Sequence, residues 1–361
     1  MKKINLFIQL LFVILFTSCL EKNKSNFQLN GVIDNIPNET SVYLAINGVV
    51  KDSTVIKDKK FTFKGSLQEP TEYDLFVKTT NDYTSIWLEN NQISFTAKKG
   101  NFSNAEIEGS ISQREYTEFR NEFNAYRDKI DSLYNIIYDK KNPDSVKLIA
   151  KNEFKANYSD RRKIDKKFIK NNPNSYVSIY LLKFYRTTFG KELTEELFNY
   201  IDDDLKHSSY GKAIKRFLSL SKNINVGDNY VDFSMKNAND QNINLSDFKG
   251  KIVLLQFWST SCGGCRSEYP FLRKAYDTYK DKGFEIVGIS NDRNRDYWLK
   301  AIKDEKLNWT NLWELNTDES DAALIYSISY MPTNFLIDQN GTIIAKDLRE
   351  DKLLEKLEEL F

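Results

Sequence analysis

The chain has 361 residues, 40% of them hydrophobic, which is enough material for two or three separate cores. Its 52 basic residues balance 51 acidic ones, for a formal net charge of +1. Because the two signs are interspersed rather than pooled, the composition argues against nucleic acid as a partner.

Residues 1–18 have the pattern of a secretory signal peptide. Two lysines precede an apolar run, and two small residues then stand directly ahead of Cys19. The run is too short for a permanent membrane span. The pattern resembles a bacterial lipoprotein signal, which implies that Cys19 is acylated and that residues 19–26 form a tether. Ordinary secretion with cleavage nearby is the alternative, and both place the protein where disulfides persist.

Residues 27–110 predict a small all-β domain. Short runs of alternating apolar and polar residues are separated by clusters of glycine, proline, asparagine and lysine. Such spacing favours an antiparallel sandwich or barrel. No catalytic constellation lies in this region, so we interpret it as a spacer or docking domain. The expected strands are residues 27–33, 41–46, 61–63, 73–77 and 93–96.

Residues 112–222 predict an α-helical segment. Seven apolar residues near its start are spaced alternately three and four apart, a heptad pattern. The pattern favours packing within a helical hairpin of the same chain, and a dimer through this segment is the alternative. Breaks at residues 142–145, residues 171–174 and Gly190 divide the segment into further helices. The apolar stripe consists of Tyr116, Phe119, Phe123, Tyr126, Ile130, Leu133 and Ile137.

Residues 226–361 alternate between strand and helix patterns, which predicts an α/β domain. A βαβ unit comes first and a ββα unit follows it. Turn residues between the last two strands, Asp-Gln-Asn-Gly at residues 338–341, favour a hairpin. The expected strands are residues 231–235, 243–245, 252–258, 284–290, 334–337 and 342–346, and the expected helices follow residue 262 and cover residues 296–305, 321–326 and 353–361.

Two cysteines, Cys262 and Cys265, lie where a buried strand gives way to a helix. The amino end of a helix stabilises an anion, so the pKa of Cys262 should fall below the free value of about 8.5. Cys265, one turn further on, can close a disulfide and resolve a mixed intermediate. A structural disulfide or half of a zinc site would share this spacing. With three cysteines and one histidine in the chain, a second pair of zinc ligands is lacking. We therefore expect a redox-active disulfide, with no metal and no other cofactor.

Several short motifs lie along residues 226–361, namely residues 226–228, 247–251, Phe257, Trp258, Cys262 to Arg266, Glu268, Pro270, Trp298, 331–333, Ile337, Asp338 and Gly341. Together they closely resemble the TlpA/ResA-type thioredoxin-like thiol-disulfide oxidoreductases of the AhpC/TSA-redoxin superfamily. The complete layout resembles Gram-negative lipoproteins that carry a redoxin domain. This resemblance implies a periplasm-facing lipoprotein of the cell envelope, and the absence of Asp at position 20 fits the outer membrane.

The resemblance also implies roles for individual residues. Cys262 would be the attacking thiolate and Cys265 the resolving thiol. Pro332 would follow a cis peptide bond beside the pair, where the backbone of Met331 can bind an incoming peptide. Trp258 is expected to join Met331 and Pro332 in substrate binding.

Glu268 matches the Cys-x-x-Cys-x-x-Glu pattern of the ResA type. Thioredoxins proper carry a buried acid six residues before the first cysteine, where this chain has Gln256. A partly buried Glu268, one turn from Cys265, would have a raised pKa and could accept the proton of the resolving thiol. A solvated surface glutamate is the alternative.

Three functions are compatible with these motifs. The first is an envelope reductase that takes electrons from a membrane donor and reduces disulfides of client proteins. The second is a thiol peroxidase, but the required Pro-x-x-x-Thr-x-x-Cys approach has Leu255 in place of the proline. The third is a non-catalytic binding or assembly lipoprotein, against which the intact dithiol motif argues.

Overall fold

A computed structural model describes residues 26–158, 161–314 and 319–361. The predicted signal peptide and Cys19 therefore lie outside the described residues. The chain divides into two compact units, one ending at Asn121 and the other beginning at Glu122. Across the described ranges, no helix is both long enough and apolar enough to cross a membrane.

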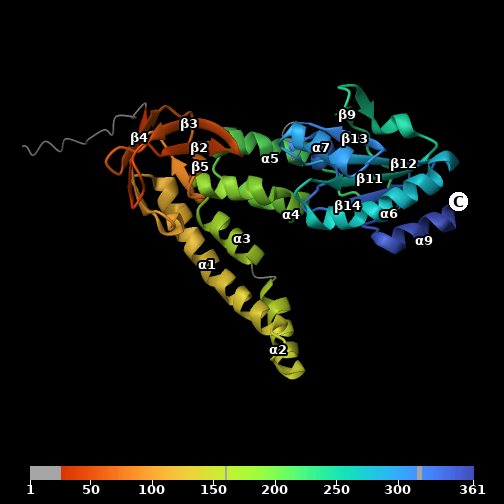
Figure 1. The fold of residues 1–361 in the computed structure, drawn as a ribbon, viewed down its shortest axis with the longest axis horizontal. Coiled ribbons are helices and arrows are strands. Elements are labelled where there is room, and N and C mark those ends of the chain that lie inside the picture. Colours follow the sequence, from red (N-terminus) through yellow and green to blue (C-terminus); the bar gives the residue numbers. More distant parts are fainter. Residues whose placement is uncertain (1–25, 159–160, 315–318) are drawn as a thin grey trace, which may run out of the picture. The chain divides into compact units, whose positions relative to one another are not determined.

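The first unit contains two four-stranded sheets (Figure 1). The strand orders are β4-β1-β7-β8 and β3-β2-β5-β6. Strand β1 pairs antiparallel with β4 but parallel with β7, so the expected wholly antiparallel pairing is wrong there. The strands are β1 (Phe27–Asp34), β2 (Ser41–Ile46), β3 (Val49–Val55), β4 (Lys60–Gly65), β5 (Thr71–Val77), β6 (Asp82–Leu88), β7 (Gln92–Lys98) and β8 (Glu106–Glu108).

Alternation of apolar and polar residues creates the core of this unit. In β7, Ile93, Phe95 and Ala97 are buried and the residues between them are exposed, because successive side chains of a strand point to opposite faces. Full burial of one large apolar side chain contributes about 1.5–3 kcal/mol. Strand β3 lacks this alternation and is exposed along almost its whole length, which explains why its sequence did not predict a strand.

Helices α1 to α5 form the middle of the chain. Leu133, in the apolar stripe of α1, is 6% exposed within the single chain. Ion pairs join Lys129 of α1 to Glu153 of α2 at 3.2 Å, and Lys167 of α3 to Glu122 of α1 at 2.9 Å. These contacts support the hairpin interpretation, and the dimer stays a prediction. The helices are α1 (Ile111–Tyr138), α2 (Asp144–Tyr158), α3 (Arg161–Asn171), α4 (Tyr176–Tyr200) and α5 (Ser209–Leu220).

Helix α4 is interrupted rather than ended at Gly190. This glycine has φ 77° and ψ 172°, outside the helical region, and the helix resumes after it. A residue with a β-carbon rarely adopts positive φ, so glycine is well suited to this position. Across the kink, the Thr194 hydroxyl donates to the carbonyl of Arg186 at 3.0 Å. The predicted helix end is therefore a kink.

The C-terminal part of the second unit is built on a seven-stranded mixed sheet of order β10-β9-β13-β12-β11-β14-β15. Central β11 runs parallel to β12 and antiparallel to β14, and β14 and β15 form the predicted hairpin. Strand β13 was not predicted. The strands are β9 (Ser234–Asn237), β10 (Asn242–Asn244), β11 (Ile252–Trp258), β12 (Phe284–Ser290), β13 (Thr310–Trp313), β14 (Thr333–Ile337) and β15 (Ile343–Lys346).

Both faces of this sheet are covered, and every residue of β11 is buried. On one face Leu254 packs in a core with Leu272 of α6 and Leu353 of α9. On the other face Leu255 packs in a second core with Ile325 of α8. This is the predicted thioredoxin-like α/β arrangement (Figure 1). The helices are α6 (Gly263–Tyr279), α7 (Arg295–Asp304), α8 (Asp321–Ile325) and α9 (Glu350–Leu360).

Candidate active site

The two cysteines lie at the amino end of α6, just beyond the carboxyl end of β11, as predicted. Cys262 is the N-cap residue, and its sulfur accepts a hydrogen bond from the backbone N–H of Cys265 at 3.1 Å. The sulfurs of the two residues form a disulfide. Cys262 is half-buried, whereas Cys265 is fully buried. One sulfur is therefore open to a partner and the other is shielded.

Small residues surround the accessible sulfur. Ser261, Gly263 and Gly264 are all exposed. A β-carbon built on Gly264 would lie 3.3 Å from Cδ of Pro332, so a side chain there would press against the proline. Nothing lies within 4 Å of a β-carbon built on Gly263. The residues directly beside Cys262 in the sequence therefore carry little side-chain bulk.

A buried carboxylate fixes the loop that leads to Cys262. Asp292 accepts hydrogen bonds from the backbone N–H and the hydroxyl of Thr260, and from the hydroxyl of Ser290 at 2.6 Å. Asp292 is 8% exposed. On the other side, Arg266 donates to the carbonyl of Thr260 at 3.1 Å. The sequence offered a signal for Asp292 that went unused: it follows β12, whose carboxyl end lies beside that of β11.

The peptide bond between Met331 and Pro332 is cis, which confirms that prediction. Both residues are half-buried, and Tyr330 before them is 54% exposed. The hydroxyl of Thr333 donates to the carbonyl of Tyr330 at 2.8 Å and so fastens the turn that enters β14. The loop reaches the CxxC segment, since Pro332 faces Gly264.

Glu268 is buried, at 4% exposure, which excludes the solvated alternative. Burial raises the pKa of its carboxyl to about 7, although the charge of Arg349 acts in the opposite direction. The negative charges of Glu350 and Asp347 add to the increase. Glu268 lies one turn beyond Cys265, on the same side of α6. A carboxyl with this pKa can exchange a proton near neutral pH.

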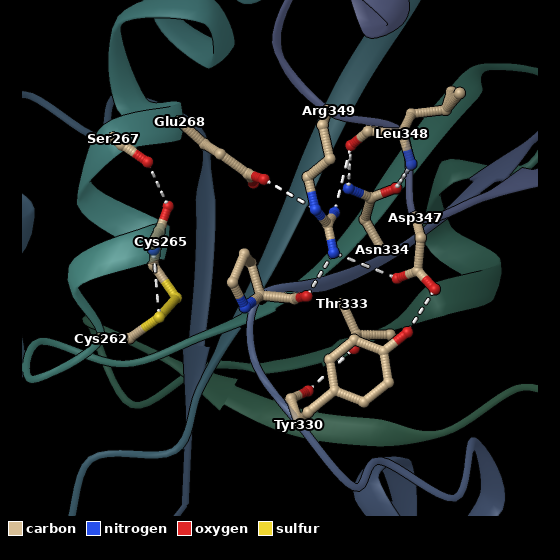
Figure 2. A network of polar contacts seen from close by, with 12 residues as sticks. Cys262, Cys265, Ser267, Glu268, Tyr330, Thr333, Asn334, Asp347, Leu348 and Arg349 are labelled. Atoms are coloured by element: carbon tan, nitrogen blue, oxygen red, sulfur yellow. Dashed lines mark hydrogen bonds and ion pairs between the residues drawn. A yellow bond between two sulfur atoms is a disulfide. The ribbon is translucent and has the colours of Figure 1, made fainter. Parts of the chain in front are cut away.

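Arg349 is the contact of Glu268 that sequence reasoning missed. Its Nε lies 3.0 Å from Oε1 of Glu268, and its Nη2 donates to the carbonyl of Pro332 (Figure 2). Two further acceptors, Asp347 and the carbonyl of Leu348, lie at 3.2 Å. The guanidinium thus joins the CxxC helix to the cis-proline loop. No local motif predicts this, because Arg349 and Glu268 are distant in the sequence.

The substrate-binding role predicted for Trp258 is wrong for the structure as it stands. Trp258 is 1% exposed and packs edge-on against Tyr269 of α6, with 6.0 Å between the ring centroids. A side chain this deeply buried cannot touch an incoming peptide, so it is a core residue beneath the site. Gln256 on the same strand is also buried, opposite Asn334 of β14. Its amide does not titrate and cannot replace the acid of thioredoxins.

Comparison with known proteins covers two parts of the chain. Residues 226–346 match the AhpC/TSA family, and residues 27–116 match a domain of unknown function, DUF4369. The thiol-disulfide oxidoreductase ResA of Bacillus cereus is 30% identical over 144 residues, which are 40% of this chain and 80% of that protein. The ResA of Bacillus subtilis is 31% identical over 123 residues, 34% of this chain and 67% of that protein.

Among solved structures, the thioredoxin domain of a thiol-disulfide oxidoreductase from Bacteroides vulgatus is 37% identical. The match covers 38% of this chain and 98% of that one, with a TM-score of 0.37. The site residues from Cys262 to Pro332 lie within the region that matches the AhpC/TSA family. The chain has the dithiol motif and is similar to ResA over most of that protein's length. It therefore belongs to the ResA-like thiol-disulfide oxidoreductases of the AhpC/TSA family.

Proposed function

We propose that this oxidoreductase reduces disulfides of client proteins in the cell envelope through Cys262 and Cys265. The observation that carries the proposal is the hydrogen bond from the helix N–H of Cys265 to the sulfur of Cys262 at 3.1 Å. An N–H donor at the amino end of a helix stabilises a thiolate. In the reduced protein this interaction favours an ionised, half-exposed Cys262 and leaves Cys265 shielded.

The proposed reaction transfers two electrons in two exchanges. The Cys262 thiolate attacks one sulfur of a client disulfide, that S–S bond breaks, and the second client sulfur leaves as a thiolate that takes up a proton. Cys265 then loses its proton and attacks the sulfur of Cys262. The mixed disulfide breaks, the client is released as a dithiol, and the pair is oxidised to the disulfide. A membrane dithiol donor would return two electrons and two protons to the pair.

We assign the proton transfer of the second exchange to Glu268. Its buried carboxyl has a pKa of about 7, so a substantial fraction is ionised at neutral pH and can take the proton of Cys265. No cofactor beyond the cysteine pair is needed in this scheme. Met331 and Pro332, half-buried beside the pair, would bind the client backbone during both exchanges.

The test is reduction of insulin disulfides, followed by turbidity, with dithiothreitol as the electron source. The purified full chain should accelerate precipitation, and protein whose reduced cysteines have been alkylated with iodoacetamide should not. Consumption of hydrogen peroxide by the reduced protein is measured in parallel. Rapid peroxide consumption without insulin reduction would overturn the proposal in favour of a thiol peroxidase. Inactivity in both assays would favour a binding lipoprotein.

We also propose that Cys19 carries a lipid that anchors the protein to the outer membrane, with the oxidoreductase domain facing the periplasm. The support is the signal pattern ahead of Cys19. Cells fed labelled palmitate should incorporate label into the wild-type protein and not into Cys19→Ala. Equal labelling of both proteins, or recovery of unlabelled wild type in the soluble periplasmic fraction, would contradict the anchor.

A further inference from the structure

Arg349 contacts two separate parts of the active site, the CxxC helix and the cis-proline loop, as well as its own neighbours in the chain. It is the N-cap residue of α9, and its side chain is 32% exposed. Nε lies 3.0 Å from the carboxylate of Glu268, Nη2 donates to the carbonyl of Pro332, and Nη2 also lies 3.2 Å from Asp347. Nη1 donates to the carbonyl of Leu348 at 3.2 Å. Figure 2 shows these groups converging on the guanidinium.

We propose that Arg349 is a positioning residue that holds Glu268 and the cis-proline loop in one fixed arrangement around the cysteine pair. This inference rests on the proposed role of Glu268 as proton acceptor. The planar guanidinium suits the task because its donors point in fixed directions and can engage a carboxylate and a carbonyl together. An ammonium group on a flexible stem has no such fork.

The segment that carries Arg349 is itself tied to strand β14. The side-chain amide of Asn334 donates to the carbonyl of Leu348 at 2.7 Å, and its oxygen accepts from the N–H of Leu348 at 3.0 Å. The N–H of Asp347 donates to the carbonyl of Asn334 at 2.9 Å. Because both ends of the Asn334 amide are used, the segment cannot slide along β14 without loss of these bonds. Arg349 therefore projects from a fixed base.

The same network reaches the surface. The hydroxyl of Tyr330 donates to Asp347 at 2.5 Å, and Asp347 pairs with Arg349. Tyr330 is exposed and directly precedes Met331, whose backbone would bind the client. A continuous path of polar contacts thus runs from the client-facing loop through Arg349 to Glu268, beneath the cysteines.

The charges that face Glu268 come from the segment before α9 and from the start of that helix. Arg349 is the cation, and Asp347 and Glu350 are the anions. Cys265 lies one turn earlier on α6, and Asn334 on β14 is uncharged. An opposite charge in contact with a carboxyl lowers its pKa by about 1–3 units. Removal of Arg349 should therefore raise the pH at which Glu268 ionises, and neutralisation of Asp347 should lower it.

The test uses the reduced full chain and Ellman's disulfide, which separates the two exchanges. Attack by Cys262 releases one nitrothiobenzoate, and resolution by Cys265 releases a second. The rate of the second release is measured from pH 5 to pH 9. In the wild type, the midpoint of this pH profile should lie near pH 7, the pKa of Glu268. In Arg349→Gln this midpoint should rise by about 1 pH unit or more, which slows the second release at pH 7 at least about fivefold.

Five further variants separate a specific effect of Arg349 from a general one. In Asp347→Asn the midpoint should move down. In Arg349→Lys, which keeps the charge but lacks the fork, the midpoint should stay near the wild-type value while the limiting rate of the second release falls. Arg273→Gln removes a guanidinium that contacts Glu305, away from the site, and should change nothing. In the double variant Arg349→Gln/Glu268→Gln, the profile should equal that of Glu268→Gln alone.

Two failures are distinguishable. If Glu268→Gln keeps the wild-type midpoint, the proposed role of Glu268 is wrong. If Glu268→Gln abolishes the midpoint but folded Arg349→Gln leaves it unmoved, the positioning role of Arg349 is wrong. Should Arg349→Gln not fold, Asp347→Asn decides the matter, because an unchanged midpoint in that variant would equally contradict the network.

Discussion

Serine in place of Cys262 is expected to lower the rate of insulin reduction at least about 10³-fold, to the rate with dithiothreitol alone. A serine hydroxyl is not ionised at neutral pH and cannot form a mixed disulfide, so the first exchange is lost. The substitution changes one atom at the N-cap, and serine is itself a good N-cap residue. The variant should fold like the wild type, and its near-ultraviolet circular dichroism checks this.

Serine in place of Cys265 is expected to have the opposite chemical consequence. Cys262 still attacks, but the mixed disulfide is no longer resolved from within. Client proteins should accumulate as complexes that migrate at higher mass on non-reducing gels and dissociate with dithiothreitol. The two variants are matched controls for each other. Equal or greater trapping by Cys262→Ser would contradict the order of attack proposed from the burial of the two sulfurs.

The second large effect concerns stability. Between pH 4.5 and pH 8, the free energy of unfolding of the wild type should fall by about 3 kcal/mol relative to that of Glu268→Gln. The sign follows from the pKa of Glu268, which is raised from 4.5 to about 7 in the folded protein. The native state then binds the proton more tightly than the unfolded chain, and this contribution to stability is lost as pH rises between these values. A neutral glutamine does not titrate.

Urea unfolding followed by tryptophan fluorescence measures this difference. Four of the five tryptophans lie within residues 226–361, so the signal reports mainly the oxidoreductase domain. Glu355→Gln, on the exposed side of α9, is the matched control for removal of one carboxylate. A constant difference between Glu268→Gln and wild type across this range would show that Glu268 ionises like an ordinary surface glutamate.

Local sequence signals predicted much of this protein well. The strand and helix around Cys262 and the final hairpin are encoded by contiguous hydrophobic patterns and turn residues, which act over a few positions. The position of Cys262 at the helix start followed from the same signals. Gly190 in the sequence correctly marked the position where the backbone of α4 changes direction. The sequence did not reveal that the helix continues beyond this glycine.

The features that the sequence did not predict depend on contacts between segments that are distant in the chain. The parallel alignment of β1 with β7 is a tertiary choice that alternation within each strand does not specify. Asp292 and Arg349 reach the site only because the sheet brings their loops beside Thr260 and Glu268. The motif that includes Trp258 marked the site correctly but did not distinguish a residue beneath the surface from one that lines it.

The small side chains around Cys262 have a consequence for the breadth of substrates. With Ser261, Gly263 and Gly264 as its rim, the sulfur presents no bulky obstacle to a large convex partner. Under the proposed function, we therefore expect folded proteins and unstructured segments to reach this sulfur with similar ease. We expect discrimination among such clients to depend on the accessibility of their own disulfides.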